Sequence, residues 1–425
     1  MFEFPTVAAI IVALIFVALL AFAAPQQFLP VVVAVGVLTS RPTAIGERYP
    51  LLGAAILTAA GIGCLILQVR TKQKTPIAPM VIFALAWFWL MWHEFLVPGS
   101  EPNLGTSWLT FLAPVLGFGF IGRDKTLLER TRRMLVGIIA GTAILTSVAI
   151  IVGALIGYTT LHLGSVGVGY ERISSGLLFP GALTYGPDVG SGIPRFLGLG
   201  REPGMGAVFL GWAFFAMPRH WAHRSALRVA LLIALAGTQS TAGIGVFAVC
   251  ATLYFVFGRK TFSPAVAIAA LIAGAITVWV AVFNPSFGFL AKGGAPSFVE
   301  RNSTALAGVR AFIEQPFTAT SDAPLSSVNL IASAAVNGAP WVVLMVIFFA
   351  LPIVRAGRKN VGAYSSLFIL VIMLTSQPTA GATAILVLSL IDYYSSRPSE
   401  SPAMFPRMST PPGSHVQNHK AGSFG

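Results

Sequence analysis

Residues Leu135–Ile156 read LVGIIAGTAILTSVAIIVGALI, an apolar run without a charged side chain. A helix rises about 1.5 Å per residue and about 20 residues cross the hydrocarbon core of a bilayer. The run is therefore long enough to span a membrane. Continuous runs predict helices, because a membrane β-barrel would show short segments that alternate apolar and polar residues.

The whole chain shares this apolar character. Its 425 residues are 56% hydrophobic and 10% charged, with a mean hydropathy of +0.81. No soluble packing scheme could bury so much apolar surface, whereas a bilayer can. The sequence predicts an all-α, polytopic helical membrane protein whose residues 1–394 form one transmembrane domain. Further apolar runs lie at Leu51–Val69, Ile77–Val97 and Ser107–Ile121.

Charge placement predicts the topology. The net charge of +13 is spread over short connections between apolar runs, which is typical of topology determinants and not of nucleic-acid binding. The positive-inside rule places these connections in the cytoplasm. They are Arg70–Lys74, Arg123–Arg133, Arg219–Arg228, Arg259–Lys260 and Arg355–Lys359. The tryptophans expected in the opposite, extracytoplasmic aromatic belt are Trp92, Trp108, Trp279 and Trp341.

The N-terminal end leaves the number of spans open. Thr6–Ala23 is expected to be an uncleaved first helix, since no basic residue precedes it. Phe28–Leu38 is short for a span and is either a short span or a re-entrant segment. The chain is therefore expected to have about twelve or thirteen transmembrane helices. Residues 395–425, rich in Pro, Ser and Gly, are expected to form a disordered cytoplasmic tail.

Two long connections, 157–200 and 284–340, fall on the extracytoplasmic side of this topology. Long loops in compact proteins are usually functional or disordered. Apolar residues at helical spacing, from Ala305 to Ile313, predict a helix in the second loop that ends at Pro316. This helix is expected to pack as a lid over the membrane surface.

A charged cluster closes the first long loop. Arg195–Ala207 reads RFLGLGREPGMGA and precedes an apolar run. Charges at a membrane boundary must be paired or solvated. Arginine binds phosphate bidentately, so Arg195 and Arg201 are candidates for a phosphate site, although solvated loop charges or lipid-headgroup contacts remain alternatives. Glu202 is a candidate base, and its pairing with Arg201 or Arg195 is favoured.

Further candidate residues lie in other segments. Arg301 and Arg310 belong to the predicted helix of the second loop, nine residues apart and thus on different faces. Ser240 lies in the Thr238–Gly245 segment, which either borders a cavity or makes an ordinary turn. The six histidines and two cysteines form no metal-ligand pattern, and no nucleotide-binding or hydrolase motif is present. Neither a metal nor a cofactor is expected.

In their order, these segments resemble the O-antigen ligase and polysaccharide polymerase superfamily. The resemblance covers roughly residues 190 to 355 in motifs and the whole chain in architecture. It consists of an Arg-x-x-Gly-x-x-x-Glu-Pro motif, a Ser-Thr-x-Gly turn between two spans and one large outer loop. The matching residues are Arg195, Gly198, Glu202, Pro203 and Ala207, then Ser240, Thr241 and Gly243, then Arg301, Phe312–Phe317, Asn329 and Gly338.

The resemblance implies a metal-independent, GT-C-like glycosyltransferase of the cell membrane. Its donor would be a glycan on a polyprenyl pyrophosphate such as undecaprenyl pyrophosphate, and its acceptor a glycan or lipid, used on the extracytoplasmic face during cell-envelope polysaccharide biosynthesis. Arg195 and Arg301 would bind the pyrophosphate, supported by Arg201 and Arg310. Glu202 would activate the acceptor or orient an arginine, and Ser240 and Asn329 would contact substrate. A polysaccharide-assembly complex is a further possible partner.

One difference from the superfamily pattern favours one of its two branches over the other. The ligase branch carries a histidine in the second loop, near the position of Ser327–Asn329, and this loop contains none. The polymerase branch is therefore favoured over the ligase branch. The competing hypotheses are a transporter or flippase of lipid-linked glycan, for which the span interiors offer few charges, and a non-catalytic envelope-assembly scaffold.

Overall fold

The computed structural model describes most of the chain between residues 19 and 396. The described residues are 19, 23–48, 50–70, 78–96, 115, 118–167, 175–186, 192–257, 264–283, 296–317, 329–356, 361–375 and 382–396. Nearly all of the predicted Thr6–Ala23 helix, most of Ser107–Ile121 and nearly all of the predicted tail lie outside these residues.

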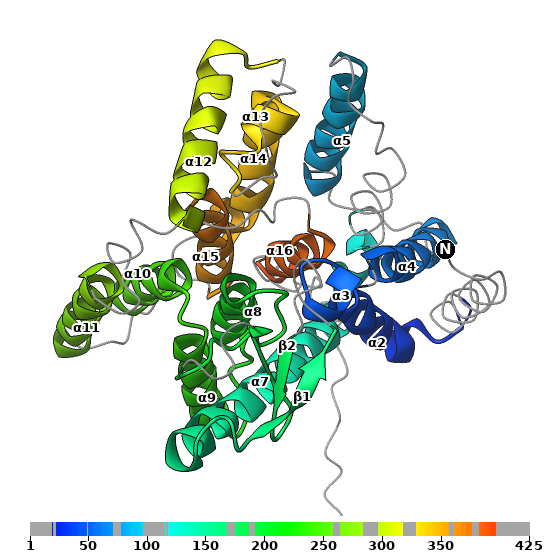
Figure 1. Ribbon diagram of the computed structural model, residues 1–425. Helices are drawn as coiled ribbons and strands as arrows, with labels where there is room; N and C mark the ends of the chain where they lie inside the picture. Colours follow the sequence, from blue (N-terminus) through cyan, green and yellow to red (C-terminus); the bar gives the residue numbers. More distant parts are fainter. Residues whose placement is uncertain are drawn as a thin grey trace, which may run out of the picture.

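The described chain is mainly helical, as predicted (Figure 1). The helices are α2 (Pro25–Leu38), α3 (Ala44–Arg48), α4 (Pro50–Arg70), α5 (Ala78–Leu96), α7 (Lys125–Ile156), α8 (Pro203–Ala216), α9 (Arg224–Gly237), α10 (Thr241–Phe257), α11 (Pro264–Phe283), α12 (Pro296–Glu314), α13 (Ala334–Asn337), α14 (Ala339–Ala356), α15 (Val361–Thr375) and α16 (Thr383–Ser395).

Three of these helices are long and apolar enough to cross a membrane. They are α4, α7 and α14, and seven other helices contribute apolar stretches of 10–17 described residues. The short run at Phe28–Leu38 belongs to α2, a helix of 14 residues followed by a turn into α3. The count of twelve or thirteen spans stays a prediction.

Helix α7 shows how the sequence sets the ends of these elements. The Asp124 side chain accepts hydrogen bonds from the backbone N–H groups of Thr126 (2.8 Å) and Leu127 (3.0 Å). These bonds satisfy two donors that the first turn of a helix leaves free. Glu129 then forms ion pairs with Arg132 and Arg133 before the apolar run begins. The helix ends at Gly157, whose φ of 93° suits glycine.

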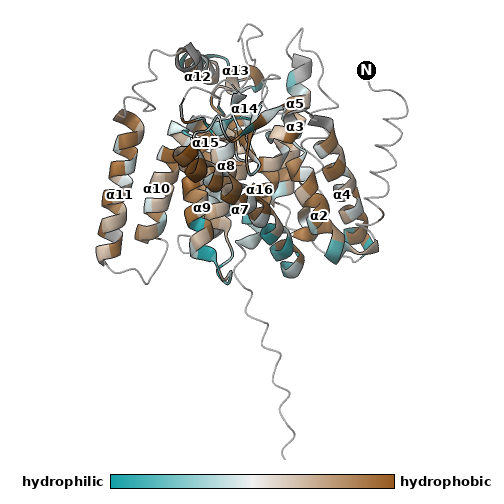
Figure 2. Cartoon of the chain, turned by 60° about the horizontal axis from the view of Figure 1, so that its bottom comes forward, coloured by the Kyte–Doolittle hydropathy of each residue, from teal (hydrophilic) through white to brown (hydrophobic). Residues whose placement is uncertain are grey.

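The polar helix ends lie on one side of the bundle. Figure 2 shows hydrophilic residues at the start of α7, the start of α9 and the end of α4, all at the lower edge of the view. Basic residues occur in each of these ends, Arg132, Arg224 and Arg70 among them. Helices α3, α12 and α13 lie on the opposite side, which is called the loop side below. Three of the five basic connections, at the end of α4 and the starts of α7 and α9, thus lie on one side, as predicted, and the orientation in the membrane stays a prediction.

Helices α8 and α16 form the core. Almost every residue of both is buried, and α8 packs against α7, α9, α10 and α15. Both lie near the middle of Figure 1. One oxygen of the buried Asp392 carboxylate joins these helices, because it accepts hydrogen bonds from Trp212 Nε1 (3.2 Å), Ser365 Oγ (2.7 Å) and Ser366 Oγ (3.0 Å).

The first long loop adds a small antiparallel sheet to the all-α architecture that the sequence predicted. Its strands are β1 (His162–Val166), β2 (Ser175–Leu178) and β3 (Ala182–Thr184), in the order β1-β2-β3. Leu161, Leu178, Ala182 and Phe196 form a buried cluster against Ala149 of α7. This apolar contact anchors the sheet at the end of the helix.

The predicted topology can be tested with two exposed positions on opposite sides of the bundle. Phe179 lies in the β2–β3 turn with 54% of its surface exposed, and His220 is exposed in the α8–α9 turn. Because Cys64 and Cys250 are buried, an impermeant thiol reagent applied to intact cells should label Phe179→Cys and leave His220→Cys unlabelled until lysis. The reverse pattern would contradict the predicted orientation.

Candidate functional site

The small sheet positions Arg195. The segment that contains it runs beside β3: Tyr185 N donates to Arg195 O (2.9 Å) and Leu197 N donates to Leu183 O (2.9 Å). The Arg195 guanidinium lies over the Tyr185 ring, 4.8 Å from its centroid. A cation over an aromatic face is stabilised by the ring quadrupole. Arg195 is therefore fixed through its backbone and its side chain.

Glycines bring the rest of this loop onto the first turn of α8. Gly198 has a φ of 56°, in the left-handed region that favours glycine. A β-carbon at Gly206 would overlap the carbonyl oxygen of Leu197. The backbone of the loop thus rests directly on the helix, and this contact sets where Arg201 and Glu202 emerge.

Glu202 is the N-cap residue of α8, and Pro203 occupies the first helical position. Its side chain makes no capping hydrogen bond. Among the described residues its carboxylate has neither an ion pair nor a side-chain hydrogen bond, so the predicted pairing with Arg201 or Arg195 is not formed there. The helix dipole stabilises a negative charge at this place. The carboxylate is half-buried and remains able to bind a ligand group.

A turn that sequence reasoning missed packs on the other side of this loop. It is Thr39–Thr43, between α2 and α3. Arg201 N donates to Pro42 O (3.0 Å) and Ala44 N donates to Leu199 O (3.0 Å), and Thr43 forms an antiparallel bridge with Gly200. The loop is thereby held between the small sheet and the α2–α3 turn.

The predicted Ser240 turn also reaches this loop. Phe196 N donates to Gly237 O (3.0 Å), and Gln239 Nε2 donates to Ile193 O (3.1 Å). Ser240 Oγ accepts from Gly243 N (3.2 Å) and so caps α10. The Ser-Thr-x-Gly segment is thus a tight turn between two helices, and it lies beside the segment that contains Arg195.

The residues predicted in the second long loop form a separate group. Helix α12 ends at Glu314, two residues before Pro316, which confirms the predicted helix. It packs against α13, and α15 lies between α12 and α8 in both views (Figures 1 and 2). Arg310 is exposed and lines a cavity of 370 Å³ along α12. The Arg301 side chain lies outside the described residues.

Asn329 has a structural partner. Its Oδ1 accepts a hydrogen bond from Ala332 N (2.7 Å), and its side chain is buried. The next residue, Leu330, donates its N–H to Met373 O (2.8 Å) at the end of α15. Asn329 therefore shapes the turn before α13, and its contact with substrate stays a prediction.

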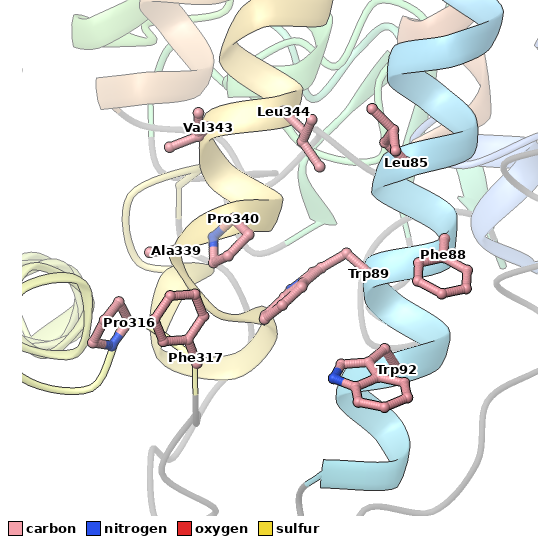
Figure 3. Close-up of a pocket in the computed structure, with 10 residues that line it drawn as sticks. All are labelled: Leu85, Phe88, Trp89, Trp92, Pro316, Phe317, Ala339, Pro340, Val343 and Leu344. Carbon is pink, nitrogen blue, oxygen red and sulfur yellow. The ribbon is translucent and has the colours of Figure 1, made fainter.

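An apolar groove opens between α5 and α14 (Figure 3). It has a volume of 780 Å³. Trp89 Nε1 in its wall donates to Asn337 O (2.7 Å), and the lining side chains present mainly hydrocarbon and aromatic surface. A cavity without polar partners does not hold ordered water and suits an apolar ligand. The lining residues are Leu85, Phe88, Trp89, Trp92, Pro316, Phe317, Ala339, Pro340, Val343 and Leu344.

No family model, no curated protein and no solved structure matches the chain. Among the described residues, no group of three or more His, Cys, Asp or Glu side chains could hold a metal ion.

The contact between the loop and α8 predicts that substitution by alanine destabilises the protein at Gly206 and not at Gly141. Gly206→Ala should lower the free energy of unfolding by about 1–3 kcal/mol, as overpacking does, and should displace Glu202. Gly141→Ala is the matched control. Gly141 lies in α7, and a β-carbon at this position would meet no neighbouring atom within 4 Å. Thermal unfolding of the purified protein measures both. Equal melting temperatures for the two variants would contradict the close contact.

Proposed function

We propose that the protein is a membrane glycosyltransferase that polymerises or ligates glycan carried on a polyprenyl pyrophosphate, with polymerisation favoured. The reaction takes place on the extracytoplasmic face of the cell membrane, and the acceptor is a glycan or a lipid. The observation that carries this proposal is the fixed loop Arg195–Glu202, which presents two arginines and a carboxylate at the start of a buried apolar helix.

The chemistry of the leaving group supports this proposal. Transfer of a glycan from a polyprenyl pyrophosphate develops negative charge on the pyrophosphate, and fixed cations lower the barrier because they need no reorganisation. Arg195 and Arg201 are held by backbone hydrogen bonds on both sides of their loop. They are therefore suited to this task, whereas Arg301 and Arg310 belong to α12, which α15 separates from α8, and their supporting role stays a prediction.

Glu202 is suited to activate the acceptor. Its carboxylate makes no ion pair among the described residues and lies one residue from Arg201. In the proposed reaction it accepts the proton of the attacking hydroxyl while that oxygen bonds to the anomeric carbon and the pyrophosphate leaves with the bonding electrons. No metal ion is needed when arginines neutralise the leaving group.

The apolar groove supports a lipid-linked donor. Most of its lining belongs to two apolar helices, one of which is long enough to span a bilayer. Phe88 and Trp92 leave 62% and 53% of their surfaces exposed, so the groove is open along α5. In the proposed function a hydrocarbon chain enters it from the bilayer and leaves the headgroup on the loop side.

If Arg195 binds the pyrophosphate, its substitution should reduce glycan formation even when the new residue keeps the positive charge. In native cells, Arg195→Ala and Arg195→Lys should each lower long-chain or ligated glycan at least about 100-fold, since lysine cannot form the bidentate fork. Glycan chain length on gels, at equal protein level, measures this. Arg219→Ala is the control, because Arg219 is exposed beyond the other end of α8. Normal glycan in both Arg195 variants would refute the pyrophosphate role.

A transporter or flippase is the second candidate function, and one observation favours it. Asp392 is a buried carboxylate within the helix bundle, and ionisable groups at such depth often mark ion or proton paths. Its hydrogen bonds to Trp212, Ser365 and Ser366 also fit a purely structural role, which the glycosyltransferase proposal expects.

Asp392→Asn separates these two functions. A proton-coupled carrier needs a group that can lose its proton, so this variant should abolish transport. A glycosyltransferase should keep most of its activity per folded molecule, because the amide oxygen still accepts hydrogen bonds. The measurement is glycan formation and lipid-linked glycan translocation in the same membrane vesicles. Lost translocation by a protein that folds normally would favour the carrier.

A further inference from the structure

The α2–α3 turn carries an arginine that the motif does not include. Arg41 is exposed and precedes Pro42, whose carbonyl oxygen accepts the hydrogen bond from Arg201 N. Thr43 and Gly200 are antiparallel bridge partners. Neighbours in the chain have Cα atoms at most about 3.8 Å apart, so the hydrogen bond from Arg201 N to Pro42 O keeps the Cα atoms of Arg41 and Arg201 within about 11 Å of each other. In the sequence 160 positions separate them.

The turn that carries Arg41 is rigid. Thr43 Oγ1 donates to Leu38 O (2.6 Å) and accepts from Gly46 N (3.0 Å). The backbone of Ser40 is so close to Gly46 and Gly53 that a β-carbon at either position would overlap it. The turn has little freedom to move, and the place of Arg41 beside the loop is fixed before any ligand binds.

A third element meets Arg41. Its carbonyl oxygen accepts a hydrogen bond from Ala384 N (3.3 Å), in the first turn of α16. The backbone of Arg41 thus joins α2, the core helix α16 and the Arg195–Glu202 loop.

We infer that Arg41 is a third phosphate-binding arginine of the site, which together with Arg195 and Arg201 binds the diphosphate of a lipid. This inference rests on the proposed function and adds a residue to its site. The three arginines come from two segments that hydrogen bond to each other, and in this proposal their long side chains reach one headgroup. A diphosphate offers enough oxygens for several bidentate contacts, and preorganised arginines bind them without a loss of loop entropy.

The test is a binding measurement on the full chain in lipid nanodiscs, with undecaprenyl diphosphate as the probe. Arg41→Gln should raise the Kd about tenfold, the loss expected for one hydrogen-bonded ionic contact. Arg41→Lys should restore part of the affinity, because it keeps the charge. Arg219→Ala should bind like the wild type. The melting temperature of each variant shows whether the junction with α16 is intact.

The outcomes separate this inference from the proposed function. If Arg195→Ala weakens binding while a folded Arg41→Gln binds like the wild type, the role of Arg41 is refuted and the proposed site stands. If the wild type does not bind the probe, or if Arg195→Ala has no effect, both are refuted. A melting temperature that falls with no change in Kd also refutes the inference, because it assigns Arg41 a structural role only.

Discussion

The loop side of the molecule depends on one close contact, between the backbone of Leu197–Gly200 and the first turn of α8. Gly206 allows it, because a side chain there would overlap Leu197 O. Since α8 is buried on almost every face, the loop that packs on it is held in place by the core. The direction in which Arg195, Arg201 and Glu202 face is thereby coupled to the packing of the whole bundle.

The carboxylates of Asp392 and Glu202 differ in their hydrogen-bond partners. Asp392, deep in the bundle, has its hydrogen bonds supplied by Trp212, Ser365 and Ser366, as buried polar groups require. Glu202, at the end of α8, has no such partner among the described residues. Glu202 is half-buried, so its carboxylate remains accessible to a ligand at the positive end of the α8 dipole. This contrast is why the proposed chemistry is assigned to the loop and the structural role to Asp392.

Much of the helical architecture could be predicted from the sequence, because apolar runs, Asp124 and Pro316 act locally to form or end helices. The tight turn at Ser240 was likewise one of two predicted alternatives. The sheet was missed since its strands have three to five residues, too few for a period, although Pro180-Gly181 between apolar residues is a turn signal. The packing of Thr39–Thr43 on the loop joins distant segments, which no local pattern encodes.

In the proposed function, the Arg195–Glu202 loop binds the headgroup of a lipid-linked donor. An experimental structure of the protein in nanodiscs with undecaprenyl diphosphate would test it most directly. We expect density for the diphosphate against Arg195 and Arg201, and for the hydrocarbon chain in the groove between α5 and α14. Density for the diphosphate within the bundle near Asp392, with the loop unoccupied, would contradict it.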